Sequence, residues 1–133
     1  MQFSLQQLTH HAIDIATNAG EVILQFFEHG NFEQFNKHDE SPVTSADYAA
    51  NEVVMSGLLQ LTPDIPIMSE ETDGLALAER KDWRRYWLVD PLDGTQEFVA
   101  GRSDFAVNIA LIEDGRPILG VVHAPATKTT YWA

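Results

Sequence analysis

The sequence contains no cysteine. This absence excludes disulfide bonds, thiolate metal sites and cysteine nucleophiles together, and it fits a cytoplasmic protein. No apolar run approaches the roughly 20 residues that a membrane-spanning helix needs, and the N-terminus carries no basic and apolar leader. We therefore expect a single cytoplasmic domain, free or peripheral to the inner membrane, without a transmembrane segment.

Basic residues are scarce as well, since 8 lysines and arginines stand against 20 acidic residues and the net charge is −12. Proteins that bind nucleic-acid polymers present basic stripes to the phosphate backbone, and none is visible here. Most of the carboxylates are typical of a solvated surface. An acidic protein that handles an anionic substrate would need cations between the two, so the segments where carboxylates cluster become the candidates for a site.

Hydrophobic spacing predicts two helices followed by a largely antiparallel sheet. Apolar residues recur at steps of three and four over residues 4–28, and a second helix is expected over 45–61. An Asp-Gly dipeptide at 114–115 predicts a hairpin. Strands are expected at 65–68, 86–89, 105–112, 117–122 and 129–132. Together these elements predict one layered α+β domain over residues 1–133, and the uncovered strand at its end predicts that the domain continues.

The strongest candidate for a functional site is Asp-Pro-Leu-Asp-Gly-Thr at residues 90–95, directly after an apolar strand. Asp followed by Pro predicts a β-turn that holds Asp90 and Asp93 within about 7 Å, near enough to bridge two divalent ions. A helix beginning at Gly94 and Thr95 would add free backbone N–H groups for a phosphate. The alternative is an ordinary turn in which either aspartate only caps the helix.

Two further acids, Glu70 and Glu71, follow another short apolar strand. Carboxylates at the ends of neighbouring strands would meet at one edge of a sheet and supply more oxygen ligands. Neither histidine nor cysteine stands nearby in the sequence, and an oxygen-only donor set favours Mg²⁺ over Zn²⁺. Lys37 and Arg102 are candidates to meet a substrate phosphate, against the alternative that they are ordinary solvated cations.

Thr44 and Asp47 allow two interpretations. Their spacing is that of a capping box at the start of the second helix. Alternatively, Asp47 and Thr95 together polarise a water for attack on phosphorus, and one residue can serve both purposes. A phospho-aspartate mechanism of the haloacid-dehalogenase type is disfavoured, because that class spaces its two aspartates two residues apart and here the step is three, with Pro91 inside it.

In order and spacing, three segments resemble the inositol monophosphatase superfamily: residues 41–47, 69–71 and 87–95. Within it, the form of these segments together with residues 105–112 and 120–125 is most similar to the CysQ-type 3′(2′),5′-bisphosphate nucleotidases. Gln96 stands where that branch usually has lysine. The resemblance covers essentially the whole chain and implies the N-terminal α+β part of the layered αβαβα sandwich shared with fructose-1,6-bisphosphatase.

The resemblance also implies a set of magnesium ligands. Glu70, Asp90 and the carbonyl of Leu92 would hold a first Mg²⁺, Asp90 and Asp93 a second, and Glu71 would lie near a third, looser ion. One family aspartate that also binds metal belongs to a motif well downstream and is not in this sequence.

Catalytic roles follow from the same resemblance. Asp47 and Thr95 would position the attacking water, Glu70 would act beside them through its metal, and Gly94 and Thr95 would cradle the phosphate. The implied reaction is hydrolysis of the 3′-phosphate of 3′-phosphoadenosine 5′-phosphate to AMP and phosphate. An inositol or sugar monophosphatase, or a truncated fragment that only binds metal or phosphate, are the alternatives. Lithium sensitivity, a role in sulfur assimilation and a homodimer are further implications.

Overall fold

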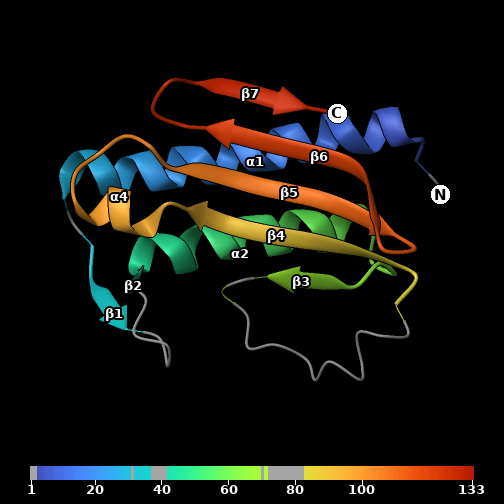
Figure 1. Ribbon diagram of the computed structural model, residues 1–133, viewed down its shortest axis with the longest axis horizontal. Coiled ribbons are helices and arrows are strands. Elements are labelled where there is room, and N and C mark those ends of the chain that lie inside the picture. Colours follow the sequence, from blue (N-terminus) through green and yellow to red (C-terminus); the bar gives the residue numbers. More distant parts are fainter. Residues whose placement is uncertain (1–2, 31, 37–41, 70, 72–82) are drawn as a thin grey trace.

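The structure is a computed structural model, and it describes residues 3–30, 32–36, 42–69, 71 and 83–133. Two long helices lie against one face of a five-stranded sheet (Figure 1). The predicted helices and the largely antiparallel sheet are confirmed, and with them the α+β class. The predictions for Lys37, Glu70 and residues 72–82 fall outside the described residues.

The first helix, α1, spans Leu5–His29. Ser4 caps its start in a capping box with Gln7, and Gly30 ends it in the left-handed conformation at φ 62°, which glycine adopts without steric penalty. The predicted apolar stripe faces the sheet, with its buried members small or aliphatic: Leu8, Ala12, Ala16, Ala19 and Ile23. Small side chains let α1 approach its neighbours closely.

The second helix, α2, spans Ser45–Leu61 and packs between α1 and strand β4, Arg85–Asp93. Gly57 brings it onto α1, since a Cβ there would lie only 2.8 Å from Cγ1 of Ile15. Beyond its last turn, the indole N–H of Trp87 donates to the hydroxyl of Thr62 at 2.9 Å and joins the helix end to the sheet. The position of α2 is therefore fixed from both sides.

The main sheet has the order β3-β4-β5-β6-β7, with β3 parallel to β4 and every other pair antiparallel. A separate antiparallel ribbon, β1 with β2, precedes α2 and was not among the strands predicted from the sequence. The short helix α4 follows β4. The remaining bounds are Gln34–Asn36 for β1, Pro42–Thr44 for β2, Ile67–Ser69 for β3, Thr95–Val99 for α4, Ala106–Glu113 for β5, Arg116–Ala124 for β6 and Thr129–Trp132 for β7.

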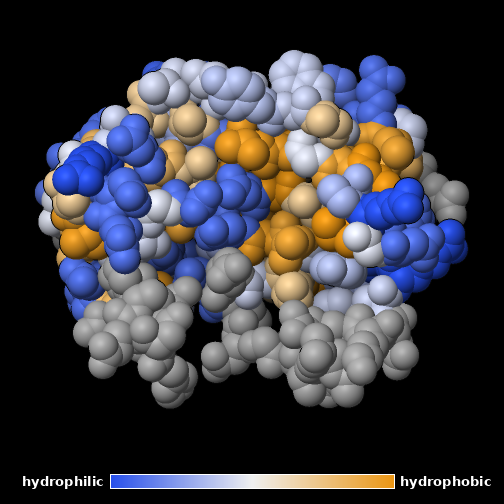
Figure 2. All heavy atoms as spheres, in the orientation of Figure 1, coloured by the Kyte–Doolittle hydropathy of each residue, from blue (hydrophilic) through white to orange (hydrophobic). Residues whose placement is uncertain are grey.

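The helices cover one face of the sheet and leave the other face open among the described residues. Alternate residues that face the helices are buried, namely Trp87, Val89, Val107, Ile109, Leu111, Leu119 and Val121. The intervening residues face the viewer in Figure 2, where a hydrophobic band crosses the centre of the molecule. A shallow hollow of about 300 Å³ lies over this band and is lined in part by Leu88, Ala110, Gly120 and Val122.

One strand differs from the sequence prediction. Strand β3 was predicted as a buried strand over 65–68, but it runs Ile67–Ser69 at the edge of the sheet, so Ile67 and Met68 are only half-buried. The hairpin prediction is confirmed, with Asp114 and Gly115 both at positive φ. No helix in the described part of the chain is long and apolar enough to cross a bilayer.

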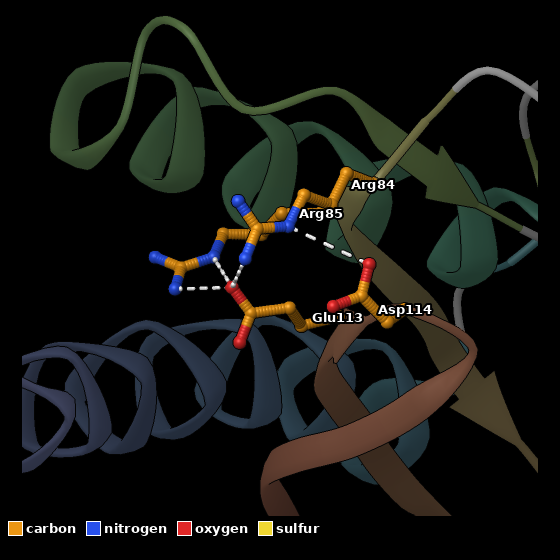
Figure 3. Close-up of polar contacts among 4 residues, drawn as sticks. All are labelled: Arg84, Arg85, Glu113 and Asp114. Atoms are coloured by element: carbon orange, nitrogen blue, oxygen red, sulfur yellow. Dashed lines mark hydrogen bonds and ion pairs between the residues drawn. The ribbon is translucent and has the colours of Figure 1, made fainter.

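Arginine side chains close the hairpin end of the sheet (Figure 3). Arg85 donates through Nη2 to Glu113 Oε1 at 2.8 Å, and Arg84 Nε lies 3.5 Å from Asp114 Oδ1. The backbone N–H of Asp114 also donates to the carbonyl of Arg84 at 2.8 Å. Both acids of the hairpin are thereby held against the start of β4.

Candidate active site

The opposite end of β4 is irregular. Asp90 pairs with Asn108 and Asp93 with Ala106, so three steps along β4 match two along β5. The extra residue makes a β-bulge, and the strand continues to Asp93. The predicted β-turn is therefore wrong. Pro91 fits such a position because it has no N–H to give to a regular ladder.

A tight bend at Gly94 follows the bulge. Gly94 has φ 98°, and a Cβ there would lie 2.7 Å from the carbonyl oxygen of Asp104. Any other residue would be strained by its backbone conformation and would also clash. The predicted helix does begin at Thr95, but α4 has only five residues. A hollow of about 510 Å³ opens beside Asp93 and Gly94, with Glu97 also in its wall.

Asp47 completes the predicted capping box and also contacts Thr95, while the predicted activation of a water by this pair stays a prediction. The side chain is fully buried, and its Oδ2 accepts from the backbone N–H of Thr44 at 2.8 Å and from the Thr44 hydroxyl at 2.7 Å, which completes the capping box. Its Oδ1 accepts from the hydroxyl of Thr95 at 2.8 Å. One oxygen thus caps α2, while the other binds the residue that opens α4.

A second side chain of α2 binds the neighbouring strand. Ser69, at the end of β3, donates its hydroxyl to Oδ1 of Asn51 at 2.5 Å and accepts from the backbone N–H of Glu71 at 3.2 Å. Asn51 stands four residues after Asp47, so both lie on the same face of the helix. Sequence reasoning missed Asn51 and Ser69, although the spacing of four from Asp47 was a signal.

Asn108 on β5 was also missed by sequence reasoning. Its Nδ2 donates to Oδ2 of Asp93 at 3.0 Å, and its register partner is Asp90. Its Oδ1 is buried and has no hydrogen-bond partner in the described part of the chain. Asn108 lies within residues 105–112 of the resemblance, but the local sequence assigned it no role, because its contact with Asp93 depends on the pairing of β5 with the bulge.

The sequence model of the inositol monophosphatase family matches residues 4–133. The chain belongs to this family. It is 54% identical to the 3′(2′),5′-bisphosphate nucleotidase CysQ of Salmonella typhimurium over 120 residues, which are 90% of this chain and 48% of that protein. The chain therefore spans about half the length of the curated relatives it matches.

Solved structures give the same fold. CysQ from Bacteroides thetaiotaomicron matches with a TM-score of 0.82 at 40% identity, covering 96% of this chain and 46% of that one. The extragenic suppressor protein suhB from Bartonella henselae matches with a TM-score of 0.85 at 27% identity, covering 95% and 48%. The two helices and the sheet are thus the N-terminal α+β part of the inositol monophosphatase fold, as predicted.

Within this family fold, the predicted metal ligands lie at one edge of the sheet. Asp90 and Leu92 belong to the end of β4, Asp93 closes it, and Glu71 follows the parallel neighbour β3. Leu92 is buried, while its carbonyl lies 3.2 Å from the Thr95 hydroxyl. Arg102 lies exposed in the connection from α4 to β5. Glu70 and Lys37 fall outside the described residues.

The donor set fits a hard divalent cation in its chemistry. The carboxylates of Asp90 and Asp93 and the carbonyl of Leu92 offer oxygen alone, which Mg²⁺ prefers. The buried and unpartnered Oδ1 of Asn108 is one more oxygen beside them. Among the described residues, which omit Glu70, no group of three acidic, histidine or cysteine side chains is close enough to hold a metal.

Proposed function

We propose that this chain supplies the first half of the active site of a magnesium-dependent phosphomonoesterase. The observation that carries the proposal is the partly buried hydrogen bond from Thr95 to Asp47, next to the bulge between Asp90 and Asp93. A carboxylate only accepts, so the proton of this bond belongs to Thr95. The lone pairs of the Thr95 oxygen then remain available to a water proton.

The proposed reaction is direct hydrolysis. Thr95 accepts a hydrogen bond from the attacking water, and Asp47 fixes the Thr95 hydroxyl in the direction that permits this. The water oxygen forms a bond to phosphorus while the bond from phosphorus to the ester oxygen breaks. The water gives up one proton, the departing ester oxygen takes up one proton and leaves as an alcohol, and the other product is phosphate. Mg²⁺, when bound, would supply the positive charge that activates the water and neutralises the departing oxygen.

Other residues of the chain would bind the phosphate and the metal ions. Gly94 makes the left-handed bend at φ 98° that places the start of α4 beside the proposed phosphate, and Thr95 would contribute its backbone N–H. Asp90, Asp93 and the Leu92 carbonyl would hold the metal ions, together with Glu70 and a looser contribution from Glu71. We propose two ions in a complete site, with a third near Glu71.

The proposed substrate is 3′-phosphoadenosine 5′-phosphate, which gives AMP and phosphate. Support comes from the identity to proteins named 3′(2′),5′-bisphosphate nucleotidase. Because the family is named for inositol monophosphatase, an inositol monophosphate is the alternative substrate to compare. Inhibition by lithium, a role in sulfur assimilation, a cytoplasmic location and a homodimer belong to the same proposal and rest on the resemblance.

The test compares Thr95→Val with Thr9→Val in the complete protein that contains this chain. Both substitutions remove a threonine hydroxyl that donates a hydrogen bond, and Thr9 is a half-buried residue near the start of α1 whose hydroxyl donates to the carbonyl of Leu5. Phosphate release from the bisphosphate nucleotide and from inositol 1-phosphate would be measured in Mg²⁺. We expect nucleotide turnover to fall about 100-fold in Thr95→Val and to be unchanged in Thr9→Val. Wild-type protein that releases no phosphate from either substrate would contradict the proposal.

A further inference from the structure

Asn108 lies where β5 meets the bulge of β4. It pairs in register with Asp90, and its side chain reaches past the extra residue to the carboxylate of Asp93. The two acids proposed to share metal ions are therefore both next to this one amide. Asn108 also stands on the sheet face that the helices do not cover, because its neighbours Val107 and Ile109 point into the core.

The direction of the amide is fixed by chemistry. The Asp93 carboxylate can only accept, so the side chain of Asn108 must present its NH₂ group to Asp93. That orientation turns Oδ1 of Asn108 into a buried position without a hydrogen-bond donor in the described part of the chain. An unpaired buried oxygen is unfavourable, so the arrangement does not serve the stability of the fold alone.

The arrangement does suit a hydrated cation. The bond to Asn108 occupies Oδ2 of Asp93 and leaves Oδ1 of that carboxylate to face a metal. Asp93 is exposed and its backbone is irregular, so among the described residues the hydrogen bond from Asn108 is what holds its side chain in one rotamer. The orphan oxygen of Asn108 can accept a hydrogen bond from a water that arrives with the ion. Hydrogen bonds of this kind orient metal-binding side chains.

We infer that Asn108 is a positioning residue that holds the Asp93 carboxylate for a divalent cation. The inference rests on the proposed function, because it takes Asp93 to be a metal ligand. It adds a residue from a different strand, whose part in the site depends on the bulge.

The test uses Asn108→Leu and Asn108→Ala in the complete protein, with Asn18→Leu and Asn18→Ala as controls on the exposed side of α1. Leucine has nearly the shape of asparagine but no donor or acceptor, and alanine cannot clash. We expect Mg²⁺ affinity, measured by calorimetric titration of the metal alone, to fall about 10-fold or more in both Asn108 variants. The melting temperature of metal-free Asn108→Leu should equal or exceed that of the wild type.

A merely structural role predicts the opposite pattern, with a lower metal-free melting temperature and an unchanged Mg²⁺ affinity, and that result would overturn the inference. The Mg²⁺ concentration for half-maximal turnover should rise in parallel with the calorimetric value, while KM for the nucleotide at saturating Mg²⁺ stays within about 2-fold. Wild-type protein that binds no Mg²⁺ would contradict the proposed function itself. Normal Mg²⁺ binding by both the wild type and the Asn108 variants would leave that function intact and exclude only the positioning role.

Discussion

The two ends of β4 both gather carboxylates, but they neutralise them in different ways. At the hairpin end, Glu113 and Asp114 are paired with the guanidinium groups of Arg84 and Arg85 (Figure 3). At the bulge end, the carboxylates of Asp47 and Asp93 accept from neutral hydroxyl, amide and backbone groups. At the hairpin end, the negative charges are therefore already paired with positive charges of the protein. In the described part of the chain, the bulge end leaves the charges of Asp47 and Asp93 without a basic partner, which is the electrostatic difference expected between a structural end and the proposed metal-binding end.

The largest effect is expected from Asp90→Asn. Asp90 is the proposed bridge between two ions, so its loss should lower turnover by more than about 100-fold and remove the rise in melting temperature that Mg²⁺ gives the wild type. Asp114→Asn makes the same chemical change at the other end of the sheet and should leave turnover within about 2-fold. Phosphate release and thermal unfolding measure both. Equal losses in the two variants would break the distinction between the ends.

Asp47→Asn sharpens the comparison further. The new amide can keep its oxygen toward Thr44, but it then presents NH₂ to Thr95 and reverses the direction of that hydrogen bond. We expect turnover to fall roughly 100-fold while the free energy of unfolding changes by less than about 1 kcal/mol. Calorimetric Mg²⁺ affinity should stay near the wild-type value. Lower stability with unchanged turnover per folded molecule would mean that Asp47 is only a helix cap.

A smaller effect is expected at the hairpin end. Arg85→Gln removes the ion pair with Glu113, and the Arg85 side chain is 41% exposed, so solvent already screens much of the attraction. We expect the free energy of unfolding to fall by about 0.2–1 kcal/mol and turnover to stay unchanged. Denaturant unfolding with and without 1 M salt would show it, since high salt should reduce the difference between the wild type and the variant. A loss of turnover would link the two ends and contradict the comparison.

The smallest effect concerns His123, which belongs to neither end. Burial lowers the pKa of His123 below its usual 6.5, and Glu21 on α1 partly opposes this. The unfolded chain therefore binds more protons than the folded one as the pH falls below about 6.5, so stability should decline there. In His123→Gln this part of the pH dependence should disappear, as thermal melts between pH 5 and 8 would show. An unchanged profile would assign the decline to other groups.

Sequence patterns predicted the elements that depend on local spacing. The stripe of α1, the capping box at Thr44 and the Asp-Gly hairpin all follow from residues within one or two turns of each other. The bulge at Asp90–Asp93 was not predictable in this way. Asp-Pro is typical of a β-turn, and only the pairing of this segment with residues 106–108 holds it in a strand.

The dependence of sequence prediction on local spacing also explains which site residues it identified. Asp47 and Thr95 were predicted together from the family resemblance, although they are separated by 48 positions in sequence. Asn51 lies in none of the segments that carry the resemblance, and Ser69 and Asn108 lie in such segments without a role that the sequence assigned. Their hydrogen-bond partners are 15 or 18 positions away. A side chain that acts through such a distant contact carries no local signal, because its role is defined by the packing of helix and sheet.

Asp47 and Asn51 lie one helical turn apart on α2, and this placement affects how much the strand ends bound to them can move. Each binds the end of a different strand, Thr95 after β4 and Ser69 at the end of β3. A helix packed on both sides is stiff on the nanosecond timescale, so the two attachments fluctuate as one body and not as independent loops. Much of the conformational entropy of these two segments is therefore lost when the chain folds, and less would remain to be lost when a ligand binds at the proposed site.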